Sequence, residues 1–244
     1  MNEKRDLEGL SALVTGATSG IGRAAAAELG RCGAEVIVHG RDGARGAEVV
    51  ERITAGGGRA RFAAADLSDP AQLDELAEQA GTVDILVNNA GVAWFGPTTQ
   101  LDVAAFDRLF TANVRAPYFV VATVAPKMAA RGSGSIINVG SMVGQVGMPG
   151  GAAYGATKAA LAAMTRSWAA EFSPAGVRVN TVAAGPVYTA IQTPDQAEAV
   201  GATTIMDRVA QPVEIAEVIV FLASPRASYI TGAVFAADGG RTAI

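Results

Sequence analysis

Short apolar runs alternate with segments of helical periodicity along most of the chain. The helical patterns include 21–31 and 43–55, and Asp69-Pro70 opens a third helix because proline suits a first helical turn. The apolar runs have strand length and lie at 11–16, 34–40, 59–67, 83–91, 134–141, 177–185 and 233–240. Their near-continuous apolar character predicts strands that are covered by helices on both faces.

Repeated strand–helix–strand units predict right-handed crossovers and a parallel sheet. We therefore expect an α/β fold with one Rossmann-like, doubly wound sheet of about seven strands, formed by a single domain over residues 1–244. Periodicity is weak from Pro186 to about Pro212, ahead of a helical pattern at 213–224. A loop of this size, about 186–211, is typical of a binding element, and we assign it to the substrate.

Composition narrows the classes of protein. The chain has 244 residues, of which 50% are hydrophobic and 17% charged, with a net charge of −4, which argues for a well-buried globule and against nucleic acid as a partner. The chain has one cysteine, Cys32, and one histidine, His39, so it can form no internal disulfide and lacks the usual set of zinc ligands. The polar start MNEKRDLEG and short apolar runs argue against a signal peptide or a membrane span, so we expect a cytoplasmic protein.

Three glycines lie between the first predicted strand and helix. Gly16, Gly20 and Gly22 allow a sharp turn and close approach of a ligand, while the helix N-terminus offers N–H groups to a pyrophosphate. The spacing G-x-x-x-G-x-G differs from the G-x-G-x-x-G fingerprint, and a structural turn or an S-adenosylmethionine site remains an alternative. We expect the neighbouring Thr18, Ser19 and Ile21 to join the cofactor contact.

Polar residues end the third and fourth predicted strands. In open α/β sheets ligands lie at the carboxyl ends of the strands, which brings Asp66-Leu67 and Asn88-Asn89-Ala90-Gly91 to that edge. The short polar side chains can bind an adenine edge or brace the loop, and Ala90 and Gly91 leave room for a ribose. Local turn capping by the asparagines is the alternative.

The end of the second strand bears on the choice of cofactor. An acid there would bind the ribose of NAD, whereas arginine would pair with the 2′-phosphate of NADP. The strand ends at Gly40 and Arg41, so NADP(H) is favoured and NAD(H) remains possible. Asp42 is a competing partner for Arg41 in a surface ion pair.

Tyr154 and Lys158 stand four residues apart in a predicted helix and therefore on one face of it. A nearby ammonium favours phenolate, so Lys158 together with the positive charge of an oxidised nicotinamide would lower the pKa of Tyr154 and let it act as general acid and base. Ser141, at the end of the fifth strand, can hydrogen-bond the substrate oxygen, or serve only as a turn residue. A lone Y-x-x-x-K is common in helices, so the pair carries weight only with its context.

Together these motifs resemble the short-chain dehydrogenase/reductase family in its single-domain branch. The resemblance spans nearly the whole chain, and YITGAVFAADGG resembles the tail of bacterial 3-oxoacyl-(acyl carrier protein) reductases. The motifs in chain order are Thr15-Gly16-x3-Gly20-Ile21-Gly22, Asn88-Asn89-Ala90-Gly91, Asn113, Ser141, Tyr154-x3-Lys158 and Ala184-Gly185-Pro186-Val187.

The resemblance implies a role for each matching residue. Tyr154 would donate and accept the proton, Lys158 would lower its pKa and hold the nicotinamide ribose, and Ser141 would orient the carbonyl. Asn113, which we expect at a helix irregularity before Pro117, would anchor a water for proton exchange. The nicotinamide side would be lined by Gly185, Pro186, Val187 and Thr189. Two departures are Ala184 in place of the usual proline and Ser19 where many NADP-using relatives carry a basic residue.

The expected substrate wall is apolar. It comprises Trp94, Val146, Met148, Tyr188, Ile191 and Met206, and neither Arg nor Lys occurs in 186–206. We therefore predict reduction of a small-molecule ketone or 3-oxo compound that is neutral at its reacting end. A non-catalytic NADP(H)-binding sensor or scaffold is an alternative, and a methyltransferase on a related sheet is another.

The helix at 152–173 is rich in alanine. Helix propensity explains much of this, but small residues also permit a second helix to approach closely. The family resemblance favours a homotetramer in which this helix and region 102–131 meet their copies across two-fold axes.

Overall fold

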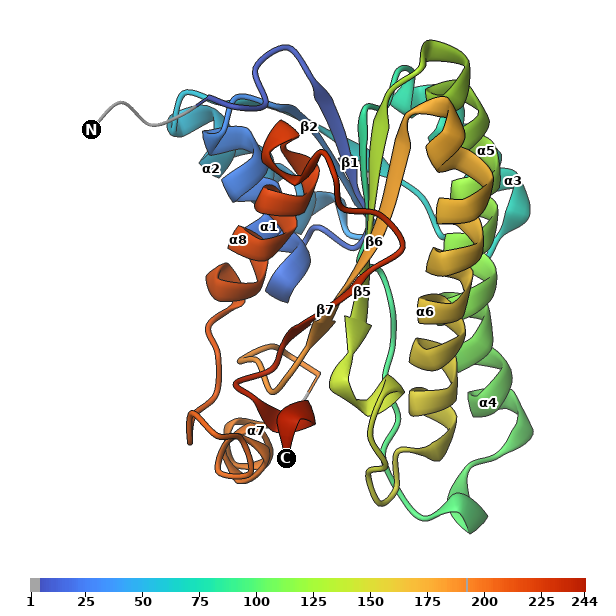
Figure 1. Ribbon diagram of the computed structural model, residues 1–244, viewed down its shortest axis with the longest axis vertical. Helices are drawn as coiled ribbons and strands as arrows, with labels where there is room; N and C mark the ends of the chain where they lie inside the picture. Colours follow the sequence, from blue (N-terminus) through green and yellow to red (C-terminus); the bar gives the residue numbers. More distant parts are fainter. Residues whose placement is uncertain (1–4, 192) are drawn as a thin grey trace.

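The computed structural model describes residues 5–191 and 193–244. Within them, seven parallel strands form one sheet in the order β3-β2-β1-β4-β5-β6-β7, which confirms the predicted α/β fold (Figure 1). The strands are β1 Ser11–Val14, β2 Glu35–Gly40, β3 Arg59–Ala64, β4 Ile85–Asn88, β5 Gly134–Ser141, β6 Val177–Ala184 and β7 Val234–Ala237.

Helices cover both faces of the sheet. One layer holds α1 Gly20–Arg31, α2 Gly43–Ala55 and α8 Pro212–Ala223, and the other holds α3 Pro70–Ala80, α4 Val103–Phe110, α5 Ala116–Arg131 and α6 Ala152–Phe172 (Figure 1). Successive strand residues point to opposite faces, so Val14 joins the core under α1 and α8 while Leu13 joins the core under α5 and α6. Two buried faces explain the near-continuous apolar strands.

Short polar side chains start three of the helices. The Asp42, Asp69 and Asp102 carboxylates accept from the backbone N–H groups near the starts of α2, α3 and α4, respectively. The predicted starts at 43 and at Asp69-Pro70 agree with these caps. A π-helical turn, η2 at Thr111–Arg115, joins α4 to α5 and confirms the expected irregularity before Pro117.

The segment expected as a loop at about 186–211 contains a helix, α7 Pro194–Gly201. Thr193 and Gln196 form a capping box at its start, and Pro194 occupies the first turn. Eight residues are too few to produce a clear periodic pattern, although the T-P-D-Q sequence carried the capping signal. The helix lies beside the C-terminal end of the chain (Figure 1).

The strand order reverses between β1 and β4, so the loops that follow these two strands diverge over opposite faces. The carboxyl ends of β1, β2, β4, β5 and β6 border the crevice that results. In the described part of the chain, none of the helices has the length and apolar character needed to span a bilayer.

Candidate active site

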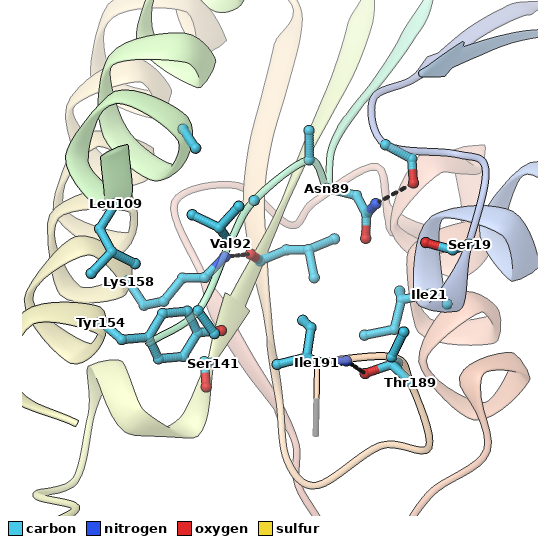
Figure 2. Close-up of a pocket in the computed structure, with 18 of the residues that line it drawn as sticks. Ser19, Ile21, Asn89, Val92, Leu109, Ser141, Tyr154, Lys158, Thr189 and Ile191 are labelled. Carbon is cyan, nitrogen blue, oxygen red and sulfur yellow. Dashed lines mark hydrogen bonds between the residues drawn. The ribbon is translucent and has the colours of Figure 1, made fainter. Parts of the chain in front are cut away.

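A cavity of about 820 Å³ lies at this carboxyl edge. It runs from Arg41 at the end of β2 to Tyr154 and Ile191 at the other end, and Figure 2 shows Ser19 and Ile21 on one side of it with Tyr154 and Lys158 on the other. The residues of the predicted site that line it are Gly16, Thr18, Ser19, Gly20, Ile21, Gly40, Arg41, Asp66, Leu67, Ala90, Gly91, Trp94, Ser141, Met148, Tyr154, Lys158, Gly185, Pro186, Val187, Thr189 and Ile191.

The structure places the remaining predicted residues outside the lining. Gly22 lies in the first turn of α1 and packs against Asn89, since a Cβ atom at this position would stand 2.3 Å from Asn89 Nδ2. Asn88 is 4% exposed, and its amide donates to Asn138 Oδ1 over 2.9 Å, so it braces β4 against β5. Asn113 is buried behind the cavity wall.

Three residues of the predicted substrate wall also lie outside the lining. Tyr188 projects outward and its hydroxyl contacts Glu198 Oε1 at 3.3 Å, while Met206 is 58% exposed. Val146 lies two residues before the lining residue Met148. Phe95, by contrast, lines the cavity and contacts the Tyr154 ring edge-on, with ring centroids 5.3 Å apart.

The glycine turn is held by the fourth strand. Gly16 and Gly20 have positive φ values of 63° and 52°, a conformation that favours glycine. Asn89 Nδ2 donates to the carbonyls of Thr15 and Gly16 over 2.9 and 3.1 Å. Sequence reasoning offered a brace for the loop as one role of the two asparagines but did not assign it to Asn89, because strand periodicity does not say which of two adjacent asparagines faces the crevice. The first residues of α1, Gly20 and Ile21, line the cavity together with Ser19. The Ser19 side chain does not cap the helix, so the N–H groups of the first turn stay available to a ligand.

Asp42 does not bind Arg41. Its carboxylate accepts from the Arg45 backbone N–H over 3.1 Å and pairs with Arg45 Nε at 3.3 Å. No ion pair joins Arg41 to another described residue, and its side chain borders the cavity at the end of β2. The adenosine end of the cleft therefore presents an arginine that is available to an anion.

The reacting end brings three predicted residues together. Tyr154 and Lys158 project from α6 and Ser141 ends β5 (Figure 2). Lys158 Nζ lies 5.7 Å from the centroid of the Tyr154 ring and donates to the Val139 carbonyl over 2.9 Å. Ser141 and Tyr154 both line the cavity, and the Ser141 hydroxyl accepts from the Val143 N–H over 3.3 Å.

Two glycines permit this closeness. The 3-10 turn η3, Met142–Gly144, packs directly on α6. A Cβ atom at Gly144 would stand 2.9 Å from the Ala159 nitrogen, and one at Gly155 would stand 2.7 Å from the Val143 oxygen. Both contacts are shorter than a Cβ atom tolerates, so glycine at these positions sets the distance between Ser141 and Tyr154.

Burial is the main cause of the pKa shifts of Tyr154 and Lys158. It raises the pKa of Tyr154, with a smaller opposite effect from the neighbouring Ser141 hydroxyl, and it lowers the pKa of Lys158 to about 8. Desolvation of the phenol outweighs the opposing influence of Ser141, and the expected lowering by Lys158 together with the positive charge of an oxidised nicotinamide stays a prediction. The phenol therefore keeps its proton at neutral pH.

Asn113 connects the π turn to both neighbouring elements. Its Oδ1 accepts from the Val92 N–H over 2.9 Å, and its Nδ2 donates to the Val92 carbonyl and to Thr157 Oγ1 over 2.8 and 3.0 Å. Thr157 in turn donates to the Tyr154 carbonyl over 2.7 Å. This series of hydrogen bonds ties the loop after β4 to the first turn of α6.

Comparisons with known proteins agree with this geometry. A family model described as enoyl-(acyl carrier protein) reductase matches residues 16–242. The chain is 40% identical, over 96% of both sequences, to cis-4-hydroxycyclohexanecarboxylate dehydrogenase of Sinomonas cyclohexanicum. It is 49% identical to a solved short chain dehydrogenase/reductase family protein, with a TM-score of 0.91 over 98% of this chain and 100% of the other.

A second solved structure is the angucycline C-6 ketoreductase LanV with bound NADP, which is 38% identical with a TM-score of 0.91 over 98% of each chain. The fold and the cleft thus define a dinucleotide-binding α/β oxidoreductase. The chain belongs to the short-chain dehydrogenase/reductase family.

Proposed function

We propose that the protein is an NADP(H)-dependent oxidoreductase that transfers a hydride between nicotinamide and a carbonyl or secondary alcohol, with Tyr154 as general acid and base. The observation that carries this proposal is a single cleft with Tyr154, Lys158 and Ser141 at one end and a glycine turn beside Arg41 at the other. The NADP-bound ketoreductase among its structural neighbours supports the same activity.

The residues present fit a bound NADP(H). The uncapped N-terminus of α1 and the glycine turn suit a pyrophosphate, and Arg41 suits a 2′-phosphate, since Asp42 is occupied by Arg45. Asp66, Leu67, Ala90 and Gly91 would border the adenosine, and residues 185–189 the nicotinamide. When bound, the cofactor supplies or accepts the hydride.

In the reducing direction Tyr154 would donate its proton to the carbonyl oxygen, which Ser141 holds by a hydrogen bond. The raised pKa of the phenol suits a proton donor at neutral pH. Lys158, protonated below about pH 8, would replenish the proton and bind the nicotinamide ribose. We keep Asn113 as the anchor of a water for this exchange, since a π turn displaces backbone carbonyls from the regular helical ladder.

We propose a substrate that is a ketone or 3-oxo compound, neutral at its reacting end. Trp94, Phe95, Met148 and Ile191 provide apolar lining there, and the segments 186–191 and 193–211 would form the rest of the pocket wall. Of the charged lining residues, Arg41, Asp42, Arg45 and Asp66 lie beyond the ends of β2 and β3, whereas Asp107 and Arg108 lie on α4 and Lys158 belongs to the reacting group.

Cofactor titration followed by a substrate panel tests the proposal. Fluorescence quenching should show tighter binding of NADPH than of NADH, and nicotinamide absorbance should report turnover of neutral ketones or 3-oxo compounds. Absence of turnover across the panel despite NADPH binding would favour the sensor or scaffold alternative. Turnover restricted to strongly anionic substrates would contradict the substrate class.

We also propose a homotetramer in the cytoplasm. Side chains on α4 and α5 leave apolar surface exposed, including Val103, Phe106, Tyr118 and Phe119. Burial of these side chains against a second copy would fit the expected contact through region 102–131. Analytical ultracentrifugation should give four times the mass of 24.7 kDa, and a monomer at micromolar concentration would contradict the assembly.

A further inference from the structure

The single histidine of the chain lies under the glycine turn. His39 is the last residue but one of β2 and is 3% exposed. Its Nδ1 stands 3.2 Å from the Gly16 backbone nitrogen, and its Nε2 stands 3.1 Å from the Ala65 carbonyl oxygen. A carbonyl only accepts, so Nε2 must carry the proton, which leaves Nδ1 as the acceptor for the Gly16 N–H.

The backbone of Gly16 is thus held from two sides, at its N–H and at its carbonyl. Asn89 on the β4 side donates to the Gly16 carbonyl, and His39 on the β2 side accepts from the Gly16 N–H. The His39 backbone carbonyl also accepts from the Ala17 N–H over 2.8 Å. Gly16 lines the cavity, in a left-handed conformation, four residues before α1 begins.

We propose that His39 is a positioning residue for the cofactor: its neutral imidazole holds the glycine turn in the shape that presents the N-terminus of α1 to the pyrophosphate. The inference rests on the proposed NADP(H) site. Because His39 acts through Gly16 and lies far from the reacting oxygen, its loss should weaken cofactor binding and leave the chemical step unchanged.

The imidazole stays neutral throughout the physiological range. Burial lowers the pKa of His39 to about 4, with a smaller lowering by Arg41 at the end of β2 and opposing effects from the Ala65 carbonyl and from Asp66 after β3. A protonated ring would turn Nδ1 into a donor facing the Gly16 N–H. The acceptor role therefore holds wherever the enzyme is folded near neutral pH.

Two substitutions separate the two hydrogen bonds of the ring. Asn places its Oδ1 at the position of Nδ1, so His39→Asn keeps an acceptor for Gly16 and loses the Ala65 contact. Gln reaches the position of Nε2, so His39→Gln keeps the donor to Ala65 and loses the Gly16 contact. The Kd of NADPH should stay within about 3-fold of wild type in His39→Asn and rise about 10-fold or more in His39→Gln.

The split between KM and kcat distinguishes positioning from general structure. The KM for NADPH should follow the Kd, while kcat at saturating cofactor stays within about 2-fold of wild type in both variants. Equal weakening in both variants, or wild-type affinity in His39→Gln, would overturn the role of His39. If wild type bound neither NADPH nor NADH, the proposed function would be wrong as well, which is a different outcome.

Hydrogen exchange at the Gly16 amide covers the case in which His39→Gln does not fold. Slow exchange in wild type and in His39→Asn, measured without cofactor, would support the bond to Nδ1. Fast exchange of this amide in wild type would contradict it, because an N–H that is bonded to a buried ring exchanges slowly.

Discussion

The two ends of the cleft are built in different ways. At the glycine turn, the side chains of Thr15, His39 and Asn89, which lie at or just beyond the ends of β1, β2 and β4, hold the backbone with hydrogen bonds. At the substrate end, Ile191 lines the cleft from a segment after β6 and is 56% exposed. The cofactor end is therefore pre-organised, whereas the substrate end includes exposed side chains on a loop.

Tyr154→Phe acts at the reacting end of the cleft and should have the largest effect. Removal of the hydroxyl eliminates the proton donor, so kcat for ketone reduction should fall by about 10²–10⁴-fold. NADPH binding should stay within about 2-fold, because the glycine turn is untouched. Steady-state rates and fluorescence titration on the same preparations check both values, and a variant with wild-type turnover would remove Tyr154 from the reaction.

His39 should make the stability of the cofactor end sensitive to acid. The unfolded chain binds a proton on this imidazole below about pH 6.5, whereas the buried ring has a pKa of about 4. The neutral His39 ring therefore makes its full contribution to the free energy of unfolding above pH 6.5. As the pH falls toward 4, the free energy of unfolding decreases by roughly 3 kcal/mol.

Denaturant unfolding of wild type and His39→Asn at pH 7 and pH 4.5 measures this loss. The carboxylates titrate in both proteins, so the difference between the two pH dependences isolates the histidine. Wild type should lose more stability than the variant on acidification. Parallel curves would show that the ring is not held neutral.

Arg41→Ala should change cofactor choice without changing chemistry. Loss of charge-assisted hydrogen bonds to a 2′-phosphate should raise the Kd of NADPH by about 10-fold or more and leave that of NADH nearly unchanged. Arg45→Ala is the matched control, since its guanidinium is paired with Asp42. An equal loss for both cofactors in Arg41→Ala would argue against phosphate recognition.

Ile191→Ala should have the smallest effect. A substrate that covers this half-exposed side chain buries part of its apolar surface, so truncation should raise the KM of a neutral ketone by about 5-fold, corresponding to ~1 kcal/mol. Val103→Ala on α4, which is 77% exposed, is a control outside the cleft. A change in NADPH affinity instead of KM for the ketone would assign Ile191 to the cofactor end.

Local patterns in the sequence determined much of this protein. Apolar runs predict the strands, and helical periodicity together with Pro70 predicts the helix starts. The spacing of Tyr154 and Lys158 places both on one helix face, because this is a contact between near neighbours. The glycine turn follows from the same local logic. The helix at 194–201 was missed since its signal was a cap and not a period.

Tertiary structure alone decided the rest, because it depends on contacts between residues far apart in the chain. Strand pairing selects Asn89 over Asn88 for the crevice and places His39 beside Gly16. The direction of the Tyr154 pKa shift follows from burial, which no spacing reveals. Sequence thus names the reacting groups, and packing sets their geometry and their proton affinities.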